Sequence, residues 1–283
     1  MYNGRILFRH RHGRERRLRA GADVLSGEKM SIKCSRTYVG CLTILVYLVL
    51  PAALHAGESG NNIDAGQKIF TYGVDDRIPA CQKCHGPDGM GLGAVDIATP
   101  RTASQTYTYL LKQLTDFATN RRTDDVMHQM NRIAKGLSEQ QRKDVATYLH
   151  SWKWPYKGSD LAQLGRDGVK IGDAGRGGRV VNFGIPERGI PACRVCHGYD
   201  GHGAGRLYPM LSGQNYLYLT HELKSFRRAA RGAKAYGRAN DFMAQMRNVA
   251  AKLNDQDIYD VAAFLTGVKP PPMPENPQGT GVE

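Results

Sequence analysis

Two short stretches of the chain carry the same potentially reactive side chains in the same order. The first runs Ile78-Pro-Ala-Cys-Gln-Lys-Cys-His-Gly86 and the second Ile190-Pro-Ala-Cys-Arg-Val-Cys-His-Gly198. On one helical turn, the two cysteines can each form a thioether with a haem vinyl group while the adjacent histidine binds the iron. We therefore expect two covalently bound haem c groups. The residues expected to hold them are Cys81, Cys84 and His85, and Cys193, Cys196 and His197.

Cysteine pairs of this kind have two other common uses. A zinc knuckle needs two pairs that close one tetrahedral site, and a thioredoxin-like dithiol does not need the histidine. Two complete motifs, each followed by glycine, favour haem over both. The other two cysteines, Cys34 and Cys41, lie in the expected presequence, so no thiol is left for a disulfide or a nucleophile.

The sixth ligand of each iron is not fixed by spacing alone. Both repeats offer two methionines in register, Met127 and Met130 in the first and Met243 and Met246 in the second. A thioether opposite a histidine fills both faces of the iron and suits electron transfer better than substrate binding. A bis-histidine haem would instead need His128, which lies between the first two methionines.

The amino-terminal part has the outline of a secretory signal peptide. Residues 39–50 form an apolar run that follows basic residues and precedes small ones. The run is short for a membrane span, which needs about 20 apolar residues, although an uncleaved anchor is an alternative. We predict that residues 1–56 are a presequence with its true start at Met30, that cleavage follows Ala56 approximately, and that the mature protein is periplasmic.

Charge argues against a nucleic-acid partner once the presequence is set aside. The whole chain has a net charge of +13, but residues 57–283 carry 29 Lys and Arg against 23 Asp and Glu, a net charge of +6, and four haem propionates would lower it further. A basic cluster in the second repeat is either a solvated face or a docking patch for an acidic redox protein. Its members are Arg227, Arg228, Arg231, Lys234 and Arg238.

Periodicity predicts an all-helical fold in two tandem domains, residues 57–156 and 157–269. Apolar spacing indicates helices over 107–117 and 216–226. A capping box predicts that the last helix of the first repeat begins after Ser138, and Asn254-Asp-Gln-Asp257 opens its partner in the second. Matching Asp-Ala-Gly segments at Asp64 and Asp173 each predict the opening of a first helix, with an acid near its positive end. We expect Trp152 and Trp154 to pack between the domains, and residues 270–283 to form a disordered proline-rich tail.

Over residues 61–268 the chain resembles the dihaem cytochrome c4 group of class I cytochromes c. The resemblance rests on the two haem motifs, on Pro209-Met-Leu-Ser-Gly-Gln214 before a tyrosine-rich helix, on Lys112-Gln-Leu-Thr-Asp-Phe117, and on Met246-Arg-Asn-Val-Ala-Ala-Lys-Leu253. It implies two tandem class I cytochrome c domains, each wrapped around one covalent haem. It also implies that the ligand methionine stands seven residues before a leucine, which selects Met130 and Met246.

The resemblance further implies a partner for each histidine. The Pro209 carbonyl should accept a hydrogen bond from the His197 ring, and Pro100 should do the same for His85, so that both prolines orient a ligand. The first repeat departs from the family pattern after its proline, where Ser104 replaces the glycine of the turn.

These features together predict an electron-transfer protein rather than an enzyme, a periplasmic dihaem cytochrome that carries single electrons between respiratory partners. The resemblance implies a quinol–cytochrome c reductase as donor and a terminal oxidase as acceptor, with peripheral membrane association as a possibility. Two alternatives stay open: a cytochrome subunit fixed to a dehydrogenase or membrane complex, and a dihaem peroxidase or thiosulfate-oxidising enzyme with an open iron position.

Overall fold

The structure is a computed structural model that describes residues 60–94, 97–125, 129–152, 158–233 and 236–269. All of these residues belong to one compact unit of the chain. The predictions for the presequence, the proline-rich tail, Met127, His128, Trp154 and Lys234 fall outside the described residues. We refer to residues 60–152 as the first repeat and to 158–269 as the second.

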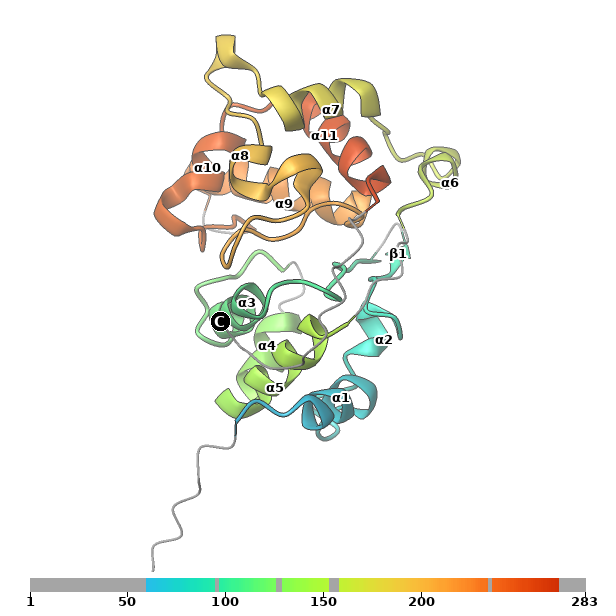
Figure 1. Cartoon of the computed structure of the whole chain (residues 1–283), viewed down its shortest axis with the longest axis vertical. Coiled ribbons are helices and arrows are strands. Elements are labelled where there is room, and N and C mark those ends of the chain that lie inside the picture. Colours follow the sequence, from blue (N-terminus) through green and yellow to red (C-terminus); the bar gives the residue numbers. More distant parts are fainter. Residues whose placement is uncertain (1–59, 95–96, 126–128, 153–157, 234–235, 270–283) are drawn as a thin grey trace, which may run out of the picture. The chain divides into compact units, whose positions relative to one another are not determined.

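The first repeat is helical apart from one short pair of strands (Figure 1). Its helices are α1 (Ile63–Tyr72), α2 (Gln82–His85), α3 (Tyr107–Ala118), α4 (Gln129–Gly136) and α5 (Glu139–His150). The strands β1 (Gly93–Ala94) and β2 (Ile97–Ala98) pair antiparallel over two residues each.

The second repeat follows the same order of main helices. Its elements are α6 (Leu161–Arg166), α7 (Ala174–Phe183), η1 (Pro186–Arg188), α8 (Arg194–His197), η2 (Tyr199–Gly201), α9 (Tyr216–Ala230), η3 (Phe242–Ala244), α10 (Gln245–Ala250) and α11 (Asp255–Gly267). The predicted all-helical class is confirmed, and a capping box forms at the start of both α5 and α11. Within the residues that the structure describes, no helix combines the length and apolar character that a membrane span requires.

A glycine lets the first and last helices of each repeat cross closely. A Cβ added at Gly66 of α1 would lie 2.1 Å from the carbonyl oxygen of Asp144 in α5, and one added at Gly177 of α7 would lie 1.9 Å from that of Asp260 in α11. Only a residue without a side chain can occupy either crossing.

These crossings also correct the expected start of the first helix. The carboxylates of Asp144 and Asp260 accept from the backbone N–H groups of Asn62 and Asp173, at 2.9 and 2.6 Å. Asn62 and Asp173 are the N-cap residues of α1 and α7, so they are the equivalent pair. The prediction of an acid near the positive end of α1 is confirmed, because Asp64 lies in the first turn. The alignment of Asp64 with Asp173 is wrong, since Asn62 is the residue equivalent to Asp173.

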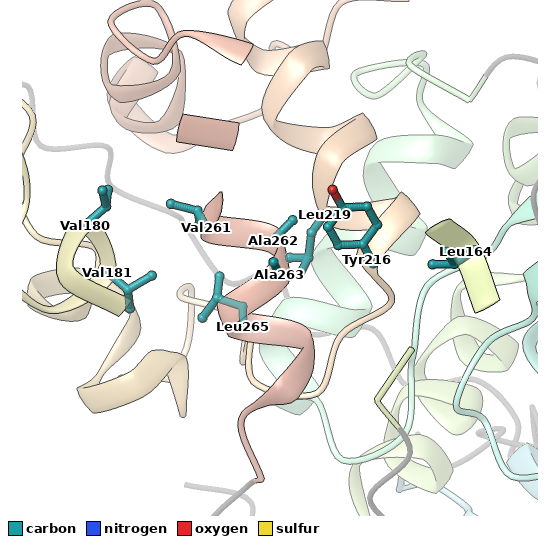
Figure 2. Packing of buried hydrophobic residues seen from close by; sticks show 9 residues of the cluster. All are labelled: Leu164, Val180, Val181, Tyr216, Leu219, Val261, Ala262, Ala263 and Leu265. Atoms are coloured by element: carbon teal, nitrogen blue, oxygen red, sulfur yellow. The ribbon is translucent and has the colours of Figure 1, made fainter. Parts of the chain in front are cut away.

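Each repeat has its own apolar core. In the second repeat, Figure 2 shows α11 between α7 and α9, with Val181 on α7 and Leu265 on α11 pointing into the same cluster. In the first repeat, Phe70 on α1 packs edge-on against Trp152, at a centroid distance of 5.3 Å. Tyr148 completes this aromatic group at 5.2 Å from Trp152. The ring of Trp152 thus packs within its own repeat, and not between the domains as predicted.

Candidate haem sites

The haem motifs form single helical turns. The backbone N–H of His85 donates to the Cys81 carbonyl at 2.9 Å, and His197 donates to Cys193 at the same distance. The two thiols of each motif therefore share one turn with the imidazole. None of the four cysteines that the structure describes forms a disulfide, which leaves all of them available for thioether bonds.

A glycine-rich loop follows each haem motif and hydrogen-bonds back to its histidine. The N–H of Gly91 donates to the His85 carbonyl at 2.8 Å, and the N–H of Gly203 donates to the His197 carbonyl at 2.6 Å. Gly91 has a φ of 81°, and a Cβ there would lie 2.4 Å from the Thr99 carbonyl oxygen. Glycine is required at this point because the two loop segments meet backbone to backbone.

The ring of each histidine is held by a proline carbonyl. His85 Nδ1 lies 3.1 Å from the Pro100 oxygen, and His197 Nδ1 lies 2.9 Å from the Pro209 oxygen. A carbonyl can only accept, so each Nδ1 carries the proton and each Nε2 keeps the lone pair that binds metal. This tautomer fits the proximal ligand of a haem iron.

Burial keeps the ligand groups in suitable protonation states. Burial lowers the pKa of both His85 and His197, with the proline hydrogen bonds opposing it in part, so neutral imidazoles prevail at neutral pH. The charge of Asp125 also opposes the shift at His85. Burial raises the pKa of the Cys81 and Cys193 thiols to about 11, so before haem is attached both are protonated at neutral pH.

The candidate methionines differ in their exposure. Met130 is half-buried on α4, and its N–H donates to the Asp125 carboxylate at 2.7 Å. Met246 is half-buried on α10, whereas Met243 is 75% exposed. Of the second pair, Met246 is therefore the better shielded, while Met127 of the first pair lies outside the described residues.

The predicted basic patch is divided. Arg238 is only 6% exposed and donates to the Glu222 carboxylate, so the prediction that it belongs to a surface patch is wrong. Arg227 is paired with Asp255, and Arg228 donates to the Tyr236 carbonyl. The ion pair offsets the charge of Arg227, whereas the bond to a carbonyl leaves the charge of Arg228 in place.

Sequence reasoning missed two sets of buried polar residues that join the repeats. One consists of Gln105 and Gln214, which are 2% and 4% exposed. The other is centred on Arg122 and Arg238. The spacing of the repeat could have identified both sets. The two glutamines are 109 residues apart, as are the tyrosine helices, and the two arginines are 116 residues apart, as are the paired methionines.

Comparison with known proteins gives a family that matches in two places. The cytochrome c family matches residues 63–153 and 191–269. The chain is 34% identical over 204 residues to the thiosulfate dehydrogenase electron acceptor of Stutzerimonas stutzeri (strain A1501), covering 72% of this chain and 86% of that protein. It is 36% identical over 192 residues to cytochrome c4 of Thiocapsa roseopersicina, covering 66% and 86%.

Two solved structures are similar as well. Reduced recombinant cytochrome c4 from Pseudomonas stutzeri matches with a TM-score of 0.57 and 30% identity, covering 74% of this chain and 100% of that one. Thiosulfate dehydrogenase from Marichromatium purpuratum matches with a TM-score of 0.62 and 28% identity over 73% of this chain. The match spans only 40% of the dehydrogenase chain.

The matches agree with the geometry of the two sites. Two cytochrome c domains, each with its Cys-X-X-Cys-His turn, confirm the prediction of two covalent haem c groups. The two relatives that this chain covers to 86% are named as a cytochrome and as an electron acceptor, which confirms the prediction of an electron-transfer protein. The chain belongs to the cytochrome c family, as a tandem dihaem electron carrier related to cytochrome c4.

Proposed function

We propose that the chain is a periplasmic carrier that moves single electrons through two His/Met haems. The proposed axial ligands are His85 with Met130 and His197 with Met246, and the thioether bonds are to Cys81, Cys84, Cys193 and Cys196. The observation that carries the proposal is the proline contact at each histidine, since it commits Nδ1 and leaves Nε2 for the iron. Pro100 and Pro209 are thus proposed as orienting residues.

When bound, each haem supplies a one-electron Fe(III)/Fe(II) couple. The protein fixes the imidazole tautomer of His85 and His197 and keeps both imidazole rings buried. Burial limits reorganisation of water when the charge of the site changes, and a methionine thioether favours the reduced iron. With a histidine and a methionine both bound, the iron would have no open position for a substrate.

The ligands are tested by the far-red sulfur-to-iron charge-transfer band of the ferric protein, quantified per haem. We expect two equivalents in the parent protein and one in each of the variants Met130→Leu and Met246→Leu. Met243→Leu is the matched control and should keep both equivalents. Loss of a band in the control, or its retention in Met246→Leu, would contradict the proposed ligand set.

For the route of electrons we propose a respiratory chain, with a quinol–cytochrome c reductase as donor and a terminal oxidase as acceptor. A second candidate donor is a thiosulfate dehydrogenase, because a relative that covers 72% of this chain is named as the electron acceptor of one. Stopped-flow reduction of the oxidised protein by each purified donor distinguishes the two. A second-order rate constant at least tenfold higher with one donor identifies the partner class.

We further propose that residues 1–56 are a presequence and that the haem domains span 57–156 and 157–269. Amino-terminal sequencing of the protein purified from the periplasm should begin near Gly57. Recovery in the membrane fraction with residues 39–50 retained would instead support the alternative of a cytochrome fixed to a membrane complex.

A further inference from the structure

Two buried glutamines each bind the backbone of the other repeat. The Gln105 side chain donates to the Met210 carbonyl at 2.8 Å and accepts from the Met210 N–H at 3.0 Å. Gln214 accepts from the Arg101 N–H at 2.7 Å and donates to the Arg101 carbonyl at 3.0 Å. Each amide thus engages both polar backbone groups of one residue, as a neighbouring β-strand would.

Arg101 and Met210, the residues whose backbone the glutamines bind, each directly follow a proline whose carbonyl accepts a hydrogen bond from a histidine ring. The Pro100 carbonyl and the Arg101 N–H belong to the same peptide group. Its oxygen accepts from His85 Nδ1 at 3.1 Å, and its N–H donates to Gln214. One amide therefore lies between the ring of the first repeat and a side chain of the second.

The second site repeats this arrangement in the opposite direction. The peptide group between Pro209 and Met210 accepts from His197 Nδ1 at 2.9 Å and donates to Gln105 at 3.0 Å. Hydrogen bonds that share a peptide group polarise one another, because donation from its N–H increases the negative charge on its oxygen. A stronger acceptor at Nδ1 gives the imidazole more imidazolate character and makes Nε2 a better donor to the iron.

We propose that Gln214 is a positioning residue for His85, and Gln105 for His197, so that each repeat sets the potential of the other repeat's haem. The proposal rests on the proposed function, in which these histidines are the proximal ligands. A more basic imidazole stabilises the ferric state. Removing a glutamine should therefore raise the potential of the haem in the opposite repeat and leave its own haem nearly unchanged.

The experiment compares Gln214→Met and Gln105→Met with the parent holoprotein. Both variants keep side-chain length but lose the two amide hydrogen bonds to the other repeat, and Gln214→Met also loses the bond from the Asn215 N–H at 2.9 Å. Tyr218→Phe is the matched control, since it removes a hydrogen bond from Arg122 across the repeats at 3.1 Å without touching a proline peptide. The two midpoint potentials are measured by spectroelectrochemical titration and assigned through the Met130→Leu and Met246→Leu variants. The Nδ1–H resonances of the ferrous protein report on the histidine hydrogen bonds directly.

We expect Gln214→Met to raise only the first-repeat potential and to move the His85 Nδ1–H resonance upfield. Gln105→Met should do the same at His197. Gln214→Glu gives the Arg101 N–H a stronger acceptor, so it should lower the first-repeat potential and move the His85 Nδ1–H resonance downfield. It carries the test if the methionine variant does not fold, and an unchanged resonance there would overturn the proposal.

Equal shifts of both potentials, a shift confined to the variant's own repeat, or the same change in Tyr218→Phe would overturn the proposal. Two charge-transfer equivalents in the parent with no effect of the glutamines would refute this inference alone. Fewer than two equivalents in the parent would refute the proposed ligation instead.

Discussion

The guanidinium of Arg122 and the carboxylate of Glu222 lie 2.7 Å apart, although 100 residues separate them in the chain. Their side chains are only 5% and 9% exposed. Arg238, the repeat equivalent of Arg122, donates to the other oxygen of Glu222. Both arginines also reach Gln113, at 2.8 and 3.0 Å, so two equivalent cations share two acceptors from different repeats.

Substituting Glu222→Gln should destabilise the protein strongly. The change leaves two buried guanidinium groups without the carboxylate that both contact, and breaking a buried ion pair in this way costs about 3–5 kcal/mol. The loss of unfolding free energy is measured by denaturation in guanidinium chloride, followed by circular dichroism. Asp75→Asn, in a pair whose Arg77 side chain is 88% exposed, is the control and should shift the midpoint far less. Similar shifts for the two variants would contradict the assigned role.

Acid should loosen the same cluster. Burial by itself would raise the pKa of Asp124, but the charges of Arg122 and Arg238 outweigh it and hold that pKa well below its ordinary value of 3.8. The folded state then binds fewer protons than the unfolded state, so stability falls as the pH drops below about 4. Thermal midpoints at stepwise lower pH should show a shallower fall for Asp124→Asn than for the parent. Identical slopes would exclude Asp124 as a source of the acid sensitivity.

The helix crossings should not tolerate a methyl group. Gly66→Ala or Gly177→Ala would place a Cβ about 2 Å from a backbone oxygen, and the helices must separate to relieve the overlap. We expect a loss of about 3 kcal/mol or more. Gly165→Ala in α6 is the control, because its Cβ would meet nothing closer than 3.7 Å and alanine favours a helix. Thermal unfolding should show a clear loss for the first two and no loss for the third.

Mild peroxide should distinguish the methionines of the second repeat. Oxidation follows exposure, and Met243 is 75% exposed while Met246 is half-buried. We expect peptide mass spectrometry to find the sulfoxide at Met243 first, with the far-red band unchanged. If the band disappears as that sulfoxide forms, Met243 and not Met246 is the ligand.

Local sequence signals predicted much of this protein. The haem turns, the starts of the two last helices and the paired tyrosine helices follow from residues a few positions apart, whose interactions are the same wherever the segment lies. The proline contacts needed more, because His85 and Pro100 are 15 residues apart and only the family resemblance joined them.

The errors arose where distant segments decide the outcome. Arg238 looked like a surface charge because its partner Glu222 lies on another element. The shared Asp-Ala-Gly segment aligns Asp64 with Asp173, whereas the hydrogen bonds to Asp144 and Asp260 show that Asn62 is the equivalent of Asp173. Such contacts depend on how helices cross, which local composition does not encode.

The charged cluster also bears on the order in which the protein can be assembled. Arg122 already has Asp124 within its own repeat at 2.9 Å, and Arg238 has Glu222 within its own. Each half thus neutralises its buried arginine before the halves meet, and their association brings together two dipolar pairs rather than two bare ions. Desolvating a pair costs far less than desolvating an ion. Neither repeat therefore depends on the other to supply a carboxylate for its buried arginine.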